Sequence, residues 1–267
     1  MSYIDAIILG LVQGLTEFIP VSSSGHLVIA SQLLGMKDAF TFDTMLNFGT
    51  LAALLIFYRK RVWDLIKRVF AGRDWTLAGQ LIVATIPAVI IGFSFSDQIK
   101  KLNSMIWVVI FMLITIGIIM VVAGKPNEDA DDRELEKSIT WPTAIKIGLA
   151  QTLALIPGTS RSGITILTGL RLNLSAARAA EFSFMLAIPV LAGGSLKVLT
   201  SEAGKTFIQQ NTGQFLVGNL VAFISGMLAI GFLIKWLGKR GLKDFGWYRI
   251  ASGILLAILL VTGIITV

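Results

Sequence analysis

The residues of this sequence that could do chemistry gather in two short polar stretches, each inside an otherwise apolar segment. The first stretch covers residues 13–26 and carries one carboxylate, Glu17, three consecutive serines at 22–24, and His26. Residues four apart share one face of a helix, so Gln13 and Glu17 point the same way, one turn before Pro20. A carboxylate, hydroxyls and an imidazole suit proton transfer and nucleophilic attack.

The second stretch covers residues 157–165 and places Arg161 between Ser160 and Ser162, with Gly158 before them and Thr165 after them. A guanidinium group donates paired hydrogen bonds to phosphate and keeps its proton. Neighbouring glycine, serine and threonine residues let backbone N–H and hydroxyl groups close around an anion. This pattern predicts an anion-binding turn. The alternative is an arginine that extends to the membrane interface.

Together the two stretches suit phosphoryl transfer, in which a hydroxyl or water attacks phosphorus while cationic groups hold the phosphate oxygens. A phosphoryl site within apolar segments implies a lipid phosphate as substrate. Two plainer alternatives are open: Glu17 is a carboxylate that only packs helices together, and His26 is a hydrogen-bonded core residue.

The composition indicates that the solvent of this chain is a bilayer. Of its 267 residues 55% are hydrophobic and 15% are charged, against roughly 25% charged in an average soluble domain. No cysteine is present and His26 is the one histidine, which excludes disulfides, cysteine-bound metals and sites with several histidines. In a membrane protein the net charge of +7 indicates basic cytoplasmic loops and no nucleic-acid partner.

The apolar segments predict an all-α polytopic integral membrane protein. Six are long enough to cross a bilayer, at about 42–58, 77–95, 104–123, 181–199, 215–236 and 248–266. Two further apolar regions, 4–35 and 143–175, are interrupted by the two polar stretches. Broken helices are tolerated in a membrane only inside protein or beside a watery cavity. We therefore expect about six full transmembrane helices plus two re-entrant pairs of half-helices.

The two broken regions resemble each other. At an offset of 138, Gly10, Gln13 and Ser22 recur as Gly148, Gln151 and Ser160. This predicts a single membrane domain, 1–267, with repeat halves of about 1–124 and 138–267 joined by an exposed polar linker at 125–137.

Lysine and arginine residues concentrate in loops 59–73 and 236–246, whereas 96–101 and 200–213 carry few. The positive-inside rule places the first two in the cytoplasm and the last two outside. Halves inserted in opposite directions form an inverted-topology repeat, whose broken helices tend to meet near the midplane and build a site.

The sequence resembles the undecaprenyl-diphosphate phosphatases, the bacitracin-resistance type of membrane phosphatase that serves bacterial cell-wall synthesis. The resemblance rests on the pair Gln13 and Glu17, on the run Pro-Val-Ser-Ser-x-Gly-His at 20–26, and on the run Pro-Gly-x-Ser-Arg-Ser-x-x-Thr at 157–165. It implies hydrolysis of undecaprenyl diphosphate to the monophosphate carrier and tolerance of bacitracin. It also implies a multi-pass protein of the bacterial cytoplasmic membrane, with its site open to the outer face.

Carried over to this chain, the resemblance points to Glu17, Ser23, His26 and Arg161 as the catalytic core. The expected substrate-binding residues are Gln13, Ser22, Ser24, Gly158, Ser160, Ser162 and Thr165. The resemblance further implies a divalent cation, Mg²⁺ or Ca²⁺. The family pattern accepts Glu or Gln at the first position, and with Gln13 there, Glu17 is the one carboxylate that this helix offers a metal.

We expect Arg161 and nearby hydroxyls to hold the diphosphate, Ser23 to be or to position the nucleophile, and His26 to act as base or leaving-group acid. A phosphoserine, a phosphohistidine and direct attack by water all stay open. Glu181 is a weaker candidate, equally well explained as a helix-end carboxylate.

The main alternative function is a polyprenyl-phosphate transporter or flippase, because broken helices in inverted repeats are common in carriers. A carrier has no use for a poised serine and histidine, which favours the enzyme. Lipid phosphatases that use two histidines are excluded by the single His26, and a scaffold leaves the buried polar groups unexplained. The expected partners are a polyprenyl diphosphate lipid and the membrane, and a homodimer is one expectation for the oligomeric state.

Overall fold

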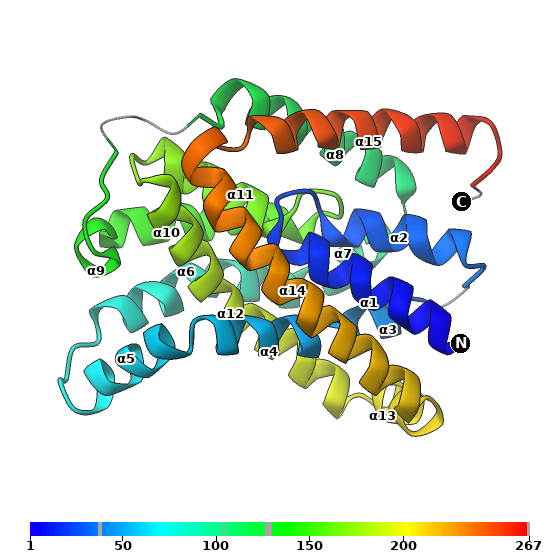
Figure 1. Cartoon of the computed structure of the whole chain (residues 1–267), viewed down its shortest axis with the longest axis horizontal. Coiled ribbons are helices and arrows are strands. Elements are labelled where there is room, and N and C mark those ends of the chain that lie inside the picture. The colour runs from blue at the N-terminus through cyan, green and yellow to red at the C-terminus, as the bar shows by residue number, and fades with distance from the viewer. Residues whose placement is uncertain (37–38, 104, 126–129, 266–267) are drawn as a thin grey trace.

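The computed structural model describes residues 1–36, 39–103, 105–125 and 130–265, which are mostly helical and contain no strand (Figure 1). The first part of the chain forms α1 (Tyr3–Phe18), α2 (Ser23–Leu33), α3 (Ala39–Met45), α4 (Asn47–Phe57), α5 (Arg59–Phe70), α6 (Thr76–Ser94), α7 (Ser96–Asn103) and α8 (Ile106–Ala123). The second part forms α9 (Leu135–Ser138), α10 (Trp141–Gln151), the 3₁₀ turn η1 (Thr152–Leu155), α11 (Arg161–Arg171), α12 (Ala176–Thr200), α13 (Glu202–Gln210), α14 (Thr212–Arg240) and α15 (Lys243–Val261).

Within the described residues, five helices are long and apolar enough to cross a bilayer: α6, α8, α12, α14 and α15. These are five of the six predicted spans. The sixth, predicted at 42–58, is a shorter apolar helix, Phe42–Phe57, with a single-residue interruption between α3 and α4. At 1.5 Å per residue its 16 residues fall short of the roughly 30 Å of hydrocarbon. The ends of the predicted spans at 104 and 266 lie outside the described residues.

Both predicted breaks are present. The chain leaves helix geometry after Phe18 and re-enters it at Ser23, and it does so again between η1 and Arg161. Pro20 and Pro157 stand inside the two breaks, where a missing N–H and a fixed φ disfavour helix continuation.

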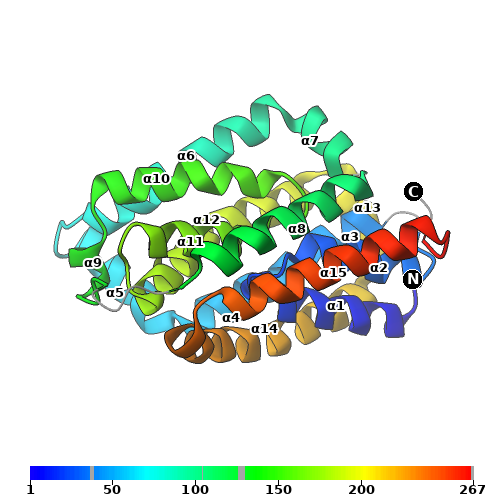
Figure 2. The same ribbon diagram turned by 90° about the horizontal axis from the view of Figure 1, so that it is seen from above.

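The broken helices pack closely against long helices from the other half of the chain. α1 lies beside α14, and α10 lies beside α6 (Figures 1 and 2). A Cβ at Gly10 would overlap the carbonyl group of Gly218, and a Cβ at Gly148 would overlap the backbone of Ala84. Small residues permit such close approach between membrane helices. In both pairs a broken helix of one half packs against a long helix of the other half. This equivalence supports the proposed division into two repeat halves.

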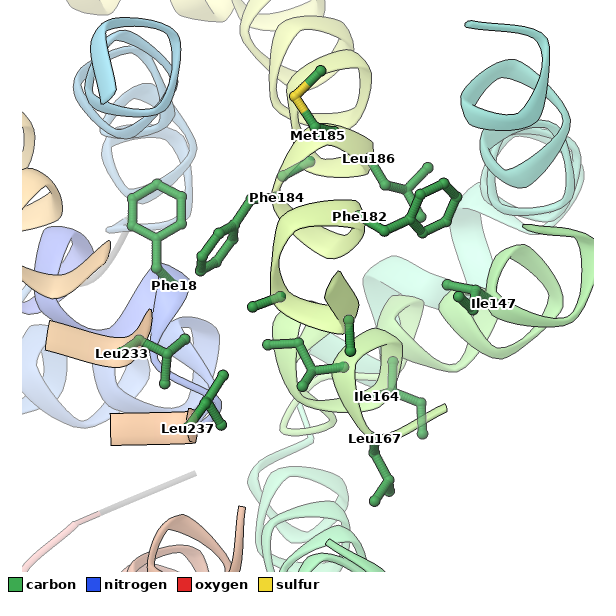
Figure 3. Close-up of a cluster of buried hydrophobic side chains, with 14 of the residues drawn as sticks. Phe18, Ile147, Ile164, Leu167, Phe182, Phe184, Met185, Leu186, Leu233 and Leu237 are labelled. Carbon is green, nitrogen blue, oxygen red and sulfur yellow. The ribbon is translucent and has the colours of Figure 1, made fainter. Parts of the chain in front are cut away.

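The apolar core lies around the first half of α12 and the ends of the broken helices (Figure 3). Phe18, the last residue of α1, meets Phe184 of α12 edge to face at a centroid distance of 5.7 Å. Ile147 of α10 and Ile164 of α11 are buried on the other side of α12. This packing fixes α1, α10 and α11 against one helix, and so fixes the ends that flank the breaks.

The polar linker is more structured than the expected exposed loop, although residues 126–129 lie outside the description. Leu135 is buried, and Glu136 of α9 forms ion pairs with Arg61 and Arg68 of α5. Arg61 also pairs with Glu181 of α12, at 2.9 Å. Glu181 therefore belongs to this ion-pair network near the start of α12, which favours the helix-end carboxylate of the two roles considered.

A candidate active site between two broken helices

The same turn precedes α2 and α11. Ser22 and Ser160 are the N-cap residues, with φ of 78° and 71°, and each hydroxyl accepts a hydrogen bond from a glycine N–H three residues on. Each hydroxyl also lies 3.2 Å from the hydroxyl of the serine two residues on. Positive φ in a residue other than glycine costs on the order of 1–3 kcal/mol and marks a constrained turn.

A polar cavity of about 370 Å³ lies between these turns. Its polar walls are formed by Gln13, Glu17, Ser22, Ser23, Ser24, Asp43, Asn47, Gln151, Ser160 and Arg161. Ala88 of α6 and Val190, Leu191 and Gly194 of α12 line its other sides. The two motifs that the sequence singled out, 144 residues apart at Glu17 and Arg161, thus form one site.

Glu17 is the centre of the hydrogen-bond network in this cavity. Ser23 Oγ donates to Glu17 Oε2 at 2.7 Å, and Gln13 Nε2 donates to the same oxygen at 3.4 Å. The other oxygen, Oε1, forms an ion pair with Arg161 Nη2 at 3.1 Å. The side chains of Glu17 and Arg161 are 11% and 10% exposed, so the pair is shielded but still reached from the cavity. A serine hydroxyl held by a carboxylate is the arrangement of a nucleophile and its base.

Arg161 begins α11, and the N-terminus of a helix favours a bound anion. Its Nη1 donates to the carbonyl oxygen of Ser183 in α12 at 3.2 Å. The guanidinium is thus anchored at one end while the other end faces Glu17. A phosphate that enters the cavity meets both a charged fork and a helix N-terminus.

Three of the expected substrate-binding residues support the turns and do not line the cavity. Thr165 is buried, donates to the carbonyl oxygen of Arg161, and shares a 2.6 Å hydrogen bond with Ser183. Ser162 is fully buried, and its hydroxyl contacts backbone oxygens at the end of α1. Gly158 has φ of 90°, and a Cβ there would overlap the backbone of Val109.

His26 is held behind the cavity wall. Its Nδ1 lies 2.8 Å from the carbonyl oxygen of Ser22, and its Nε2 lies 2.8 Å from the hydroxyl group of Tyr248. A carbonyl oxygen only accepts, so Nδ1 donates and Nε2 accepts from Tyr248. Among the described residues, the hydrogen bonds of the ring go to Ser22 and Tyr248, and none goes to Ser23 or Glu17. The role of His26 as base or leaving-group acid stays a prediction.

Arg249 is a buried residue that joins the two breaks and that the sequence motifs do not include. Its side chain is completely buried and donates to the carbonyl oxygens of Pro20, Met112 and Gly158 at 3.3, 3.2 and 2.6 Å. Pro20 belongs to the first break and Gly158 to the second, so one side chain from α15 joins both. No carboxylate pairs with it among the residues that the structure describes. A charged residue inside a predicted span was the available signal.

Asp43 and Asn47 were also missed, although Asp43 is the one acidic residue in the apolar segment 42–58. Both line the cavity, and Asn47 Oδ1 accepts from Gln13 Nε2 at 2.9 Å. In the described part of the chain, Asp43 Oδ1 has no hydrogen-bond partner. Mg²⁺ is typically held by one or two carboxylates together with substrate phosphates. Glu17 and Asp43 both line the cavity, while the described residues contain no group of three or more His, Cys, Asp or Glu side chains that could hold a metal without the substrate.

Fold and site define a polytopic helical membrane protein with a cavity that combines a serine–carboxylate pair and an anion-binding arginine. The family model described as "Bacitracin resistance protein BacA" matches residues 6–255. The chain belongs to this family. It is 40% identical over 273 residues to a protein of Bdellovibrio bacteriovorus named undecaprenyl-diphosphatase, and the match covers 98% of each chain.

Proteins with the same name from two other bacteria match equally well along their length. The protein of Clavibacter michiganensis is 40% identical over 274 residues, and one from Porphyromonas gingivalis is 39% identical over 280 residues. Each match covers 99% of this chain and 99% of the other protein. The resemblance seen in the two polar stretches therefore extends over the whole chain.

Proposed function

We propose that this protein hydrolyses undecaprenyl diphosphate to undecaprenyl phosphate and inorganic phosphate, and so recycles the lipid carrier of cell-wall synthesis. Three relatives that match over nearly the full length carry the name undecaprenyl-diphosphatase. The observation in the structure that carries the proposal is the 2.7 Å hydrogen bond from Ser23 to Glu17, whose other oxygen faces Arg161. The proposed nucleophile, Ser23, and the proposed anion ligand, Arg161, thus both contact Glu17, the proposed base.

In the proposed mechanism the diphosphate replaces Glu17 as the partner of Arg161 Nη2, while Nη1 stays on Ser183. Its oxygens meet the guanidinium and the N–H groups at the start of α11. Arg161 thereby turns from Glu17 to phosphate, and Glu17 stays hydrogen-bonded to Ser23, whose proton it accepts. Ser22 and Ser24, at the wall of the same cavity, donate further hydrogen bonds to the phosphate oxygens.

Ser23 Oγ then attacks the terminal phosphorus, and its proton passes to Glu17. The bond from that phosphorus to the bridging oxygen breaks, the proton passes from Glu17 to the leaving phosphate, and undecaprenyl phosphate leaves. Glu17, again a carboxylate, then deprotonates a water molecule that attacks the phosphoserine, and this proton passes to Ser23 Oγ as the bond to phosphorus breaks and inorganic phosphate leaves. Without a covalent step, the same pair positions and deprotonates a water molecule that attacks phosphorus directly.

We propose that a divalent cation, Mg²⁺ or Ca²⁺, binds in the cavity at Glu17 and Asp43. When bound, such a cation offsets the negative charge of the diphosphate. The donor chemistry described above supports this assignment. Gln13 and Asn47, which are hydrogen-bonded to each other at 2.9 Å, orient the amide oxygens on the same wall.

We further propose that the protein lies in the bacterial cytoplasmic membrane, with the cavity open to the outer face. The cavity is lined by the part of α12 that leads to Thr200 and by Ala88, near the end of α6. Loop charges predict that both of these ends are outside. A homodimer stays a prediction. Because the chain has no cysteine, single cysteines at Lys205 and Lys239 can test the orientation with a membrane-impermeant maleimide, which should label only the first from outside.

The activity is tested with purified protein in detergent, by measuring phosphate release from a polyprenyl diphosphate with and without EDTA. We expect release by the parent and loss of release in folded Ser23→Ala and Arg161→Ala variants. A well-folded parent that releases no phosphate, with Mg²⁺ or Ca²⁺ added, would contradict the proposal. Transport of a polyprenyl phosphate would then be the function to test.

A further inference from the structure

A small basic pocket lies on the surface of α14, near the C-terminal end of this helix. Its volume is about 260 Å³, below the roughly 300–1,000 Å³ of pockets for drug-sized ligands, so it suits a group of the size of a phosphate. Three basic and two aromatic side chains line it: Phe232, Lys235, Trp236, Lys239 and Arg240. They stand three or four positions apart, so they share one face of the helix.

The aromatic side chains of the pocket hold one of its cations. The ring of Trp236 lies 5.2 Å from the ring of Phe232 and 6.1 Å from the ring of Phe245 in α15, centroid to centroid. The guanidinium of Arg240 lies over the same indole ring, 5.2 Å from its centroid, and 3.6 Å from the carboxylate of Asp244. Arg240 is therefore already engaged by a ring and a carboxylate.

Lys235 and Lys239 are the cations that this pocket offers to a ligand. Both are exposed, and neither forms an ion pair with any carboxylate in the described part of the chain. Like charges four residues apart on a helix repel each other. An anion held between the two lysines removes this repulsion, so the pocket is complementary to a negatively charged group.

An exposed apolar stripe leads along α14 to the pocket. Ile224, Leu228 and Phe232 are exposed and four residues apart, so they follow one another along the helix surface. The eight residues from Ile224 to Phe232 rise by about 12 Å, which is most of one half of a hydrocarbon core roughly 30 Å thick. Loop charges predict that the basic end of α14 reaches the cytoplasmic side. The stripe thus matches the acyl region of the cytoplasmic leaflet, and the pocket matches its headgroup region.

We propose that the pocket binds the phosphate headgroup of an anionic phospholipid of the cytoplasmic leaflet, with an acyl chain along the apolar stripe. Basic pockets beside transmembrane helices recognise such headgroups. A free phosphate compound would use the two lysines but not the stripe, and a zwitterionic lipid would bring its own cation to them. The pocket shares no lining residue with the polar cavity, so this inference does not depend on the proposed function.

The test measures lipid binding by the purified protein in a neutral detergent, without turnover. Phosphatidylglycerol and phosphatidylcholine with identical acyl chains are titrated, and bound lipid is counted by native mass spectrometry. Lys235→Gln is combined with Lys239→Gln. The matched control combines Lys60→Gln with Arg73→Gln, which removes the same charge at two exposed residues that lie outside the pocket and are also predicted to be cytoplasmic.

We expect the parent to bind phosphatidylglycerol more tightly than phosphatidylcholine. The pocket variant should weaken binding of phosphatidylglycerol by at least about tenfold, the loss of two cations at a membrane surface, and should leave phosphatidylcholine binding unchanged. The control should bind as the parent does. In addition, a phosphatidylglycerol with a photoreactive group on its acyl chain should label the parent at residues 224–232.

Equal binding of phosphatidylglycerol by the pocket variant and the parent would overturn the inference. An equal loss in the control would also overturn it, because net charge alone would then attract the lipid. Glycerol 3-phosphate that binds as tightly as phosphatidylglycerol would identify a site for free phosphate compounds, and labelling confined to other helices would place the lipid elsewhere. Either result would contradict the proposal.

Discussion

Arg249 Nη2 donates to the carbonyl oxygen of Gly158 at 2.6 Å, and this hydrogen bond ties the second broken helix to α15. The same guanidinium holds the first break through Pro20. The three hydrogen bonds of Arg249 go to backbone carbonyl groups, and we expect it to act as a positioning residue that sets the distance between the two turns.

Replacement of Arg249 by lysine should therefore reduce activity in a folded protein. A lysine ammonium cannot reproduce the planar fork that reaches three carbonyl groups. We expect kcat to fall at least tenfold, with KM changed little, because the turns that place Ser23 and Arg161 shift. Arg249→Leu should in addition destabilise the protein, since each buried carbonyl group left without a donor costs about 1–3 kcal/mol.

The checks are steady-state kinetics and thermal unfolding in detergent. Arg240→Leu serves as control, because the Arg240 side chain is 66% exposed and its change should stay within about 0.5 kcal/mol. Wild-type kcat in Arg249→Lys would refute the positioning role.

The Ser23–Glu17 pair makes a sharper prediction about the chemistry. Ser23→Ala and Glu17→Gln should each lower kcat at least about a hundredfold, the lower end of what a positioned base contributes. Ser31→Ala of α2 is a matched control, because the buried Ser31 hydroxyl has no hydrogen-bond partner among the described residues. Phosphate release from a diphosphate by rapid-quench kinetics measures the effect. Equal activity in Ser23→Ala and the control would remove Ser23 from the mechanism.

The residues of the site that stand in short sequence motifs could be predicted from the sequence. Glu17, Ser23 and Arg161 stand in polar runs that interrupt apolar segments, and the structure brings these three together. Arg249 could have been noticed as a charged residue inside a predicted span, but its partners could not be predicted, because they are backbone carbonyl groups up to 229 residues away and backbone groups leave no pattern in a sequence.

The fold differs from the sequence prediction at the span 42–58 and at the polar linker, and in both places contacts between distant segments or helix ends decide the structure. Hydropathy predicts a span at 42–58, but apolar content does not show where helices end, and α3 and α4 meet at Leu46, which keeps right-handed helical dihedral angles (φ −67°, ψ −13°). The linker was predicted to be solvated from its charges, but Glu136 meets Arg61 of α5 at 2.7 Å. A charge run is solvated only when no opposite charge from a distant segment packs against it.

Tyr248 and His26 allow a test of how the histidine acts. If His26 works by holding the Ser22 carbonyl group, Tyr248→Phe should preserve most of the activity, since the 2.8 Å contact to Ser22 remains. We expect a loss of at most about tenfold, the effect of one neutral hydrogen bond. His26→Ala should lose more, because the turn is then released. The measurement is kcat in the two variants. Equal losses would contradict this role of His26 and indicate that the Tyr248 hydroxyl takes part in the reaction directly.

The ion-pair network around α9 predicts how stability depends on pH. Burial alone would raise the pKa of Glu136, but the hydrogen bond from Arg61 and the charges of Arg61 and Arg68 outweigh it, so this pKa lies below its ordinary value. A lowered pKa in the folded state gives stability that is present above the unfolded pKa of about 4.3 and is lost as the pH falls below it.

Glu136→Gln should therefore lower Tm by about 2–4 °C at pH 7, equivalent to about 1 kcal/mol, and by less at pH 4. Glu134→Gln is the control, because the Glu134 side chain is 66% exposed. Thermal unfolding at both pH values is the measurement. A difference between Glu136→Gln and parent that grows toward pH 4 would contradict the sign of this effect.

Asp43 makes the last prediction, which concerns the divalent cation. The carboxylate lines the cavity, and one of its oxygens is buried without a hydrogen-bond partner within the described residues. If it holds a cation together with Glu17, Asp43→Asn removes one negative charge from the donor set and should weaken Mn²⁺ binding by about tenfold or more. Titration with Mn²⁺, followed by electron paramagnetic resonance in the presence of methylene diphosphonate, measures this without turnover. Asp244→Asn, on the partly exposed start of α15, should bind as the parent does. Unchanged Mn²⁺ affinity in Asp43→Asn would mean that the cation is bound without Asp43, and would leave Glu17 and the diphosphate oxygens as its ligands.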